Sequence, residues 1–434
     1  MKNNEERFGR IRFYSYLCAI LIITELTRMT IKRLSWLTAM LVAMVGTAHA
    51  ETEATIEASA GNEALNEAVA EVAEVEAAME KATVEVPAWV KNIKFSGYGM
   101  LQYQGQDPYK VSNGELEKNN SNTFNLRLAR FILDGKIGDF DWRAQIQGTN
   151  LKGPGEPTVQ LVDLYAEWRK YPEFKIRAGQ FKRAFTFENP THPITQGWYS
   201  YANVINALSG FGDRTGEKSS GGRDIGIQFS GDIIPNANGR KLLHYQIGVY
   251  NGEGINSKDQ DNKKDIIGGL WIMPIQGLRI GAFGWTGTDG EVAATYTDGS
   301  GVKNSVALKS VRKNRYCLSA EYDKDEYTFR AEYLHSQGWG ANLDLGDKAD
   351  GWYAFGIVPV VKSKLHAKAR YQTYRDNKEW NRAKTMYEVG LNYFFTKNLQ
   401  LNFEYARVND RSIQVLNDSK HNYNFVDLEL DFRF

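Results

Sequence analysis

The sequence predicts an all-β fold: a sixteen-stranded antiparallel transmembrane β-barrel with a short N-terminal helical extension on the periplasmic side. Apolar and polar residues alternate along sixteen segments, most of them about ten residues long, the length with which a tilted strand crosses a bilayer. The connections between these segments are alternately short and long, which is typical of outer-membrane barrels. The chain also ends inside such a segment, 422–434, as expected for the strand that closes a barrel.

The composition fits a barrel better than a bundle of membrane helices. The chain has 434 residues, 42% of them hydrophobic, and its mean hydropathy of −0.47 is too polar for a helical membrane protein. A barrel can be this polar because only every second strand residue meets lipid. Aromatic residues make up 12%, which suits interfacial girdles but also a soluble β-rich protein. The formal net charge of +1 does not indicate a nucleic-acid partner, and we expect none.

The N-terminal part of the chain has a different character. Residues 29–50 have a basic start, a short apolar run and an Ala-His-Ala site, which predicts a secretory signal peptide. Translation is therefore expected to start at Met29, with 1–28 as a non-native upstream segment. Residues 51–91 are rich in Ala and Glu, with apolar residues at helical spacing, which predicts a helical periplasmic extension. A weak coiled coil and a solvated acidic tether both remain open for this extension.

The predicted barrel occupies 92–434. Its alternating segments are 92–104, 122–136, 140–148, 159–169, 174–181, 223–231, 243–251, 265–273, 277–286, 314–322, 327–336, 351–359, 363–375, 384–395, 398–409 and 422–434. The tight connections include 274–276, 323–326, 360–362 and 396–397. The long polar connections include 105–121, 252–264, 287–313, 337–350 and 410–421. An even number of strands places both ends of the barrel on the short-turn, periplasmic side.

The last predicted strand has one apolar and one charged face. Phe434, Phe432 and Leu430 lie on the apolar face, which is expected to meet outer-membrane lipid. A terminal aromatic residue at the membrane interface resembles the assembly signal of other outer-membrane barrels. We therefore expect these three residues to be read by the barrel-assembly machinery.

The connection 182–222 breaks the pattern, because it is far longer than the other connections. A structureless loop of such length is usually functional. Sixteen strands enclose a water-filled channel, which a loop folded inward could narrow. An external lid is the alternative interpretation.

Several stretches resemble the phosphate-selective porins O and P. They are KFSGYGMLQY (94–103), FNLRLARFILDGKI (124–137), IRAGQFKRAFTFEN (176–189), GRDIGIQFSG (222–231) and YQIGVYNGEGIN (245–256). The resemblance implies a sixteen-stranded homotrimeric channel in the Gram-negative outer membrane, constricted by its third external loop and guiding phosphate or related anions. The chain departs from the family at Arg127-Leu128-Ala129-Arg130, where relatives tend to have two adjacent arginines. No motif places the family's phosphate-binding residues one by one.

If the apolar members of each strand face lipid, the other side chains point into the lumen. The candidate pore-lining residues are Lys364, His366, Lys368, Arg370, Arg127, Arg130, Arg143, Arg177, Arg279, Arg315 and Arg330. The candidate constriction residues are Lys182, Arg183, Arg214, Lys218 and Arg223. Cations lining a narrow pore favour anions, so we expect an anion preference for small solutes. The alternatives are that these cations pair with inward acids and that the channel is a general diffusion porin.

Other functional classes have less support. We find no G-x-S-x-G or H-E-x-x-H pattern and expect no enzyme activity, no catalytic residues and no cofactor. After signal removal Cys317 is the remaining cysteine, so no cysteine metal site is expected. An outer-membrane adhesin or enzyme is a less favoured alternative.

Overall fold

The computed structural model describes residues 92–107, 109–110, 116–117, 122–149, 159–216, 220–377, 379, 382–412 and 422–434. The predictions for 1–28, 29–50 and 51–91, and the candidate residue Lys218, lie outside the described residues. Within the described part of the chain, no helix is long and apolar enough to cross a membrane.

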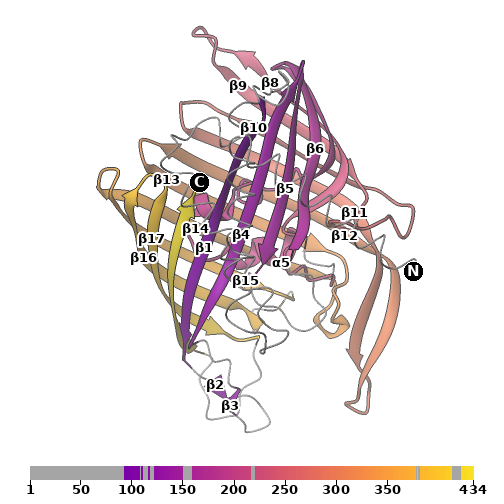
Figure 1. Ribbon diagram of the computed structural model, residues 1–434. Coiled ribbons are helices and arrows are strands. Elements are labelled where there is room, and N and C mark those ends of the chain that lie inside the picture. The colour runs from indigo at the N-terminus through magenta and orange to yellow at the C-terminus, as the bar shows by residue number, and fades with distance from the viewer. Residues whose placement is uncertain are drawn as a thin grey trace, which may run out of the picture. The chain divides into compact units, whose positions relative to one another are not determined.

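Sixteen antiparallel strands form one closed barrel in which neighbours in sequence are neighbours in the sheet. They are β1 (Lys94–Gln106), β4 (Asn122–Ile137), β5 (Phe140–Thr149), β6 (Val159–Tyr171), β7 (Phe174–Lys182), β8 (Arg223–Pro235), β9 (Lys241–Tyr250), β10 (Asp265–Ile272), β11 (Leu278–Thr297), β12 (Lys303–Lys324), β13 (Tyr327–Gln337), β14 (Lys348–Val361), β15 (Leu365–Arg375), β16 (Lys384–Thr396), β17 (Leu399–Asp410) and β18 (Asn422–Arg433). Figure 1 shows the first strand beside the last, which pair antiparallel. The predicted strand number and closure are confirmed.

Two short strands, β2 (Tyr109–Lys110) and β3 (Leu116–Glu117), pair with each other in the connection between β1 and β4. The single-turn 3-10 helix η3 (Leu343–Leu345) lies in the connection between β13 and β14. Both belong to the long connections, which alternate around the barrel with turns as short as Asp325–Glu326 between β12 and β13.

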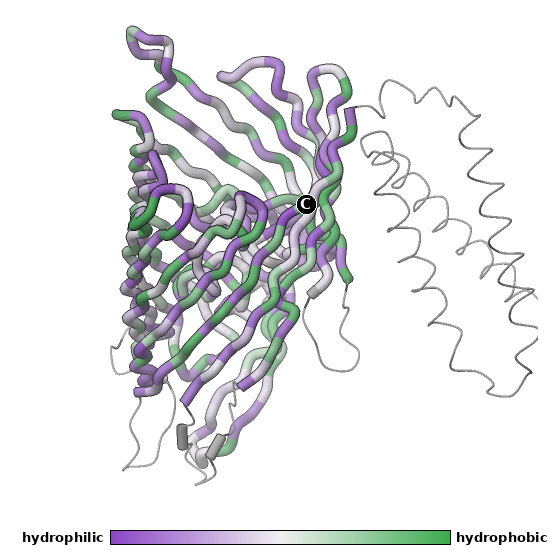
Figure 2. Tube along the Cα trace, turned by 60° about the vertical axis from the view of Figure 1, so that its left-hand side comes forward, coloured by the Kyte–Doolittle hydropathy of each residue, from purple (hydrophilic) through white to green (hydrophobic). Residues whose placement is uncertain are grey.

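The strands present apolar residues outward and mostly polar residues inward, except where apolar wall residues pack against the inner loop. On β17, Phe403 and Tyr405 are exposed on the outer face, whereas Asn402 and Glu404 are buried on the inner face. Figure 2 shows this alternation of hydrophilic and hydrophobic residues along the strands. The pattern is the one that a barrel surrounded by lipid requires, because successive strand residues point to opposite faces.

The segment 287–313 is not the long irregular connection that the sequence predicts. β11 and β12 continue as a hairpin to a turn at 298–302, with pairs extending to Thr297 and Lys303. An apolar face is present here, where Val292 pairs with Leu308 and Ala294 with Val306, but it is short and lies within a segment rich in Gly, Thr and Asp, so the sequence predicts a connection instead. Its buried residues Val292 and Ala294 face the β13–β14 connection, where the Thr295 N–H donates to the Ala341 carbonyl at 2.8 Å.

The C-terminal residue joins the barrel seam. The backbone of Phe434 makes two hydrogen bonds with Gly97 on β1, each 3.0 Å long. Its ring lies near Phe95 and Phe131, with ring centroids 5.9 Å and 6.0 Å apart. A Cβ at Gly97 would come within 2.5 Å of the Phe434 ring, so the glycine makes this packing possible.

The loop 183–222, here called the inner loop, folds into the barrel and does not form an external lid. It contains two short helices, α4 (Pro193–Gln196) and α5 (Asn203–Leu208). The carbonyl of Ile194 accepts hydrogen bonds from Gln400 on β17 and from Arg433, the last residue of β18. The carbonyl of Leu208 accepts one from Arg315 on β12. The inner loop therefore contacts well-separated parts of the wall.

An apolar cluster fixes the inner loop to the wall. Phe185, Phe187, Trp198, Ile205 and Leu208 of the loop are buried. The wall residues in the same cluster include Phe283, Trp285, Tyr353 and Phe355. Burial of a large aromatic or aliphatic side chain contributes about 1.5–3 kcal/mol, so this cluster gives the loop a defined position.

Candidate pore and constriction

The inner loop covers the inward residues of β15–β18, here called the covered wall. It consists of Lys368, Arg370, Glu388, Glu404, Asp427, Glu429 and Asp431. The side chains of Lys368 and Arg370 are 0% exposed. The Trp198 ring of the loop lies 4.8 Å from Lys368 Nζ and 4.5 Å from Arg370 Cζ. Water in an open passage does not reach these cations.

The cations of the covered wall are paired with acids. Lys368 Nζ lies 3.2 Å from a Glu404 oxygen, and Arg370 donates twice to Glu388, at 2.6 and 2.7 Å. Lys368 and Arg370 also donate to backbone carbonyls of the inner loop. The charges of Lys368 and Arg370 in the segment 363–375 are therefore neutralised by acids, which is the alternative that the sequence leaves open. The same two side chains hold the inner loop in place through its carbonyls.

The other two candidates of that segment lie elsewhere. Lys364 is exposed in the turn between β14 and β15. His366 Nε2 lies 2.9 Å from Glu326, a residue of the neighbouring short turn. The four residues thus share one face of the segment but do not form one charged surface.

The acids of β18 are also buried. Asp427 accepts a hydrogen bond from Gln102 at 2.8 Å, and Asp431 accepts one from Asn402 at 2.7 Å. Glu429 pairs with Arg127 at 2.8 Å. None of the three acids is more than 2% exposed. Amide donors thus bond Asp427 and Asp431, although Asp431 Oδ1 has no partner within the described residues.

The inward cations of β4–β8 form the adjoining surface on the other side of β1, here called the basic wall. It consists of Arg127, Arg130, Arg143, Arg177, Lys182 and Arg223. A register shift between Met100 and Leu101 of β1 leaves Arg127 as an extra residue on β4. Such a bulge changes which side chains point inward beyond it. It explains how Arg127 and Arg130, three residues apart, both reach the lumen.

Two cations of the basic wall have no acidic partner. Arg130 donates to Gln147 Oε1 at 2.8 Å, and its Nη1 has no hydrogen-bond partner within the described residues. Lys182 Nζ donates to the Asn189 carbonyl at 2.6 Å and to the Tyr201 hydroxyl at 3.3 Å. Among the residues described, no carboxylate lies within ion-pair distance of either. Arg223 beside them pairs with Asp163 at 2.6 Å.

The pKa of His192 on the inner loop is affected by this excess of positive charge. Burial first, and then the nearby Arg130, Lys182 and Arg143, lower the pKa of His192 to about 3. Its Nε2 lies 3.4 Å from Arg143 Nη1. The imidazole is therefore neutral at physiological pH, and the charge of this region comes from the wall cations.

The remaining candidates are paired. Arg143 bonds Asp134, Arg177 bonds Glu167, Arg315 bonds Asp213, and both Arg279 and Arg330 bond Glu321. Arg183 is buried and pairs with Asp224 at 3.0 Å. Arg214 donates to the carbonyls of Gly338, Gly346 and Asp376, so it fixes the end of the inner loop. Sequence reasoning missed Trp198 and Gln147, although the aromatic run 198–201 was a visible signal.

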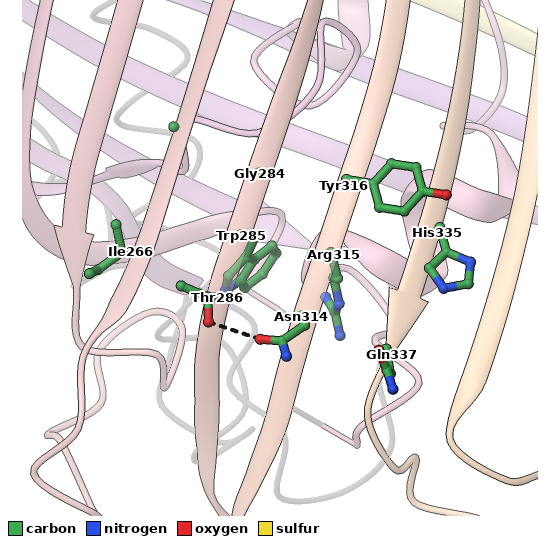
Figure 3. Close-up of a pocket in the computed structure, with 10 residues that line it drawn as sticks. Ile266, Gly284, Trp285, Thr286, Asn314, Arg315, Tyr316, His335 and Gln337 are labelled. Carbon is green, nitrogen blue, oxygen red and sulfur yellow. Dashed lines mark hydrogen bonds between the residues drawn. The ribbon is translucent and has the colours of Figure 1, made fainter.

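A hollow of about 730 Å³ lies on the outer face of the barrel, between β10 and β13. Figure 3 shows its labelled side chains, and Ile266 and Tyr316 among them are exposed outward. Thr286 and Asn314 form a hydrogen bond of 2.8 Å across its floor. Because the side chains of Trp285 and Arg315 point inward while their neighbours point outward, this hollow is separate from the lumen.

Two family models match the sequence. One, described as phosphate-selective porin O and P, matches residues 95–264, and the other, described as Gram-negative porin, matches residues 255–412. The resemblance noted from the sequence is thus confirmed. No curated protein matches the chain.

Solved structures share the fold. An anion-selective porin from Comamonas acidovorans has 11% sequence identity and a TM-score of 0.54, covering 79% of this chain and 99% of that chain. OprB of Pseudomonas putida has 10% identity and a TM-score of 0.53, covering 79% and 94%. OmpT of Vibrio cholerae has 12% identity and a TM-score of 0.51, covering 79% and 97%. At these identities the similarity shows the fold alone.

The two family models match adjoining parts of the described barrel, and the fold is the same as in solved outer-membrane porins. The family models indicate a porin channel. The chain belongs to the Gram-negative porins and forms a channel in the outer membrane.

Proposed function

We propose that the channel prefers small anions and that the basic wall, where it meets the inner loop, sets this preference. The observation that carries the proposal is the pair of cations without an acidic partner, Arg130 and Lys182. Arg130 is itself 4% exposed, but the side chains of Arg143 and Arg177 on the same wall are 26% and 27% exposed, so water reaches this side of the lumen.

The physical reason is the short range of charge in salt water. Exposed charges are screened within about 8 Å at physiological ionic strength. Ions therefore respond mainly to charges that border their path. The acids of the covered wall lie beneath the inner loop, so they offset the basic wall less than a count of charges implies.

The first test is the zero-current potential of the parent channel in a planar bilayer across a tenfold KCl gradient. In an anion-preferring channel the zero-current potential has the sign of the chloride equilibrium potential, and its magnitude grows as the salt concentration falls. A potential near zero would replace the proposal with a general diffusion porin, and the opposite sign would contradict it.

We propose inorganic phosphate or related small anions as solutes, because the N-terminal half of the barrel matches the phosphate-selective family model. Added phosphate should then reduce chloride current at low concentration. Sulfate at equal ionic strength is the control. Equal effects of the two anions would remove phosphate as the preferred solute.

The assembly is also a proposal. We expect a homotrimer, embedded in outer-membrane lipid and delivered by a signal peptide at 29–50 and the barrel-assembly machinery acting on Phe434. Deleting 51–86 should leave trimers in mild detergent, since wall-to-wall contacts are expected to hold them. Finding only monomers would show that the N-terminal extension is the principal contact.

Catalysis and adhesion are the competing functions. We propose neither, since the cations of the lumen serve in ion pairs and loop contacts, and we expect no cofactor or metal in the lumen. An adhesin would show little conductance in the same bilayer experiment.

A further inference from the structure

The connection between β9 and β10, residues 251–264, carries an acidic cluster on the same side of the barrel as the other long connections. One oxygen each from Glu253, Asp259 and Asp261 lies within 4.8 Å of the others. An acidic cluster on a surface loop is common and often binds nothing. The state of Glu253 distinguishes this cluster from such cases.

Glu253 is a buried carboxylate with an unused oxygen. The residue is 6% exposed, and its Oε2 accepts a hydrogen bond from Gln260 at 3.2 Å. Its Oε1 is buried and has no hydrogen-bond partner within the described residues. Leaving a charged buried oxygen unsatisfied is costly, which indicates that a positive ligand belongs there.

The backbone beside Glu253 leaves room for this carboxylate. A Cβ at Gly290 on β11 would lie 2.3 Å from Oε1, so any other residue at 290 would displace it. The buried Glu253 carboxylate therefore has space beside the other two acids of the cluster.

The other two acids are held in place by the protein. Asp261 accepts a hydrogen bond from the Thr288 hydroxyl at 2.7 Å and another from the Lys263 N–H at 2.9 Å. Asp259 accepts the N–H groups of Asp261 and Asn262 and also bonds Lys264, which is 44% exposed on the outer side. Neither Glu253 nor Asp261 has a lysine or arginine partner within ion-pair distance in the described part of the chain.

We propose that Glu253, Asp259 and Asp261 bind one calcium ion. Calcium takes six to eight oxygen ligands at about 2.3–2.6 Å, so oxygens on one ion lie up to about 5 Å apart, as these do. Magnesium needs ligands at about 2.0–2.1 Å in strict octahedral geometry, which would require the three carboxylates to move closer. Water and backbone carbonyls would complete the coordination.

The position suggests what the ion does. The Gly252 N–H donates to Asp224, the partner of Arg183 at the start of the inner loop. Asp289 bonds Thr215 near the end of that loop at 2.6 Å. A calcium ion at Glu253 would therefore fasten the external connection, the β11–β12 hairpin and both ends of the inner loop.

The test is isothermal titration calorimetry of the full-length chain, purified in detergent and freed of divalent ions with EGTA and then of the chelator. The parent should bind one Ca²⁺ per chain, and a tenfold excess of Mg²⁺ should not displace it. Glu253→Gln and Asp261→Asn should each weaken binding at least tenfold. Glu291→Gln, a change of the same kind at an exposed residue beside Gly290, should bind as the parent does.

A parent that shows no saturable Ca²⁺ binding would overturn the proposal without any variant. So would a Glu253→Gln protein that binds as tightly as the parent, because the unsatisfied oxygen would then have no role. Equal competition by Mg²⁺ would overturn the assignment to calcium. Far-UV circular dichroism and heat-modifiable mobility report folding, and the Ca²⁺-induced rise of the parent's thermal midpoint gives a second readout.

Discussion

The two walls of the lumen carry similar kinds of charge but arrange them differently. On the covered wall, Lys368 and Arg370 are buried, paired with acids and bonded to the inner loop. On the basic wall, Arg130 and Lys182 have no acidic partner within the described residues, and Arg143 nearby is partly exposed. The two walls therefore differ in pairing more than in burial, since Arg130 is 4% exposed, as Lys368 is, and Lys182 also donates to a carbonyl of the inner loop.

The comparison shows that pairing and exposure, more than the number of charges, determine what a permeating ion meets. The covered wall has more acids than cations, and the basic wall has more cations than acids, so a sum over the lumen nearly cancels. The opposite charges of a buried ion pair largely cancel at a distance, whereas the charge of a cation without an acidic partner, such as the buried Arg130, is not cancelled by a neighbouring acid.

The largest expected effect concerns the buried pair Arg370–Glu388, of which both side chains are 0% exposed. Arg370→Met should lower the free energy of unfolding by about 3–5 kcal/mol, because Glu388 would remain buried without its cation. Urea unfolding in lipid vesicles, followed by circular dichroism, measures the change.

The control is Arg370→Met combined with Glu388→Met, which removes both charges and should recover most of the stability. If the single variant loses less than about 1 kcal/mol, the pair is exposed to water and the covered wall lines the passage after all.

A smaller effect is expected at Trp198, whose ring covers Lys368 and Arg370. Trp198→Phe keeps an aromatic ring but weakens the cation–π contacts, and should cost about 0.5–2 kcal/mol. The indole N–H has no partner within the described residues, so no hydrogen bond is lost. Unfolding measured by circular dichroism gives the loss, and a loss above about 4 kcal/mol would show that the ring mainly fills the core.

The smallest effect is expected at Lys364, which is exposed in the turn outside the covered region. Lys364→Gln removes a positive charge near the mouth, where salt screens it. The zero-current potential at physiological ionic strength should equal that of the parent. A clear shift would extend the selective region to this rim of the barrel.

The barrel was predictable because its signal is local. Alternation of apolar and polar residues in 398–409 and in 422–434 indicates strands β17 and β18. The short turns indicate which strands are neighbours. The same signal is weaker at 287–313, where the apolar face around Val292 and Ala294 is short and lies within a segment rich in Gly, Thr and Asp.

The site was predictable only in part. Sequence reasoning found the inward cations, but not which of them are paired, because pairing depends on register between distant residues such as Lys368 and Glu404. The bulge at Arg127, which brings Arg130 inward, leaves no sequence mark that we recognise. The amide partners of Asp427 and Asp431 likewise come from neighbouring strands.

The most direct test compares two double variants that change titratable groups of opposite kind. Arg130→Gln with Lys182→Gln replaces the two basic side chains of the basic wall that have no acidic partner among the described residues, and Asp427→Asn with Asp431→Asn replaces two carboxyl groups of the covered wall by amides. Both keep the size of the side chains near that of the parent.

The measurement is the zero-current potential of each variant across a tenfold KCl gradient at low salt. The first variant should lose most of the anion preference, whereas the second should stay close to the parent, since its acids lie beneath the inner loop. Equal and opposite shifts would show that total charge governs selectivity, and an unchanged potential in the first variant would contradict the role of Arg130 and Lys182.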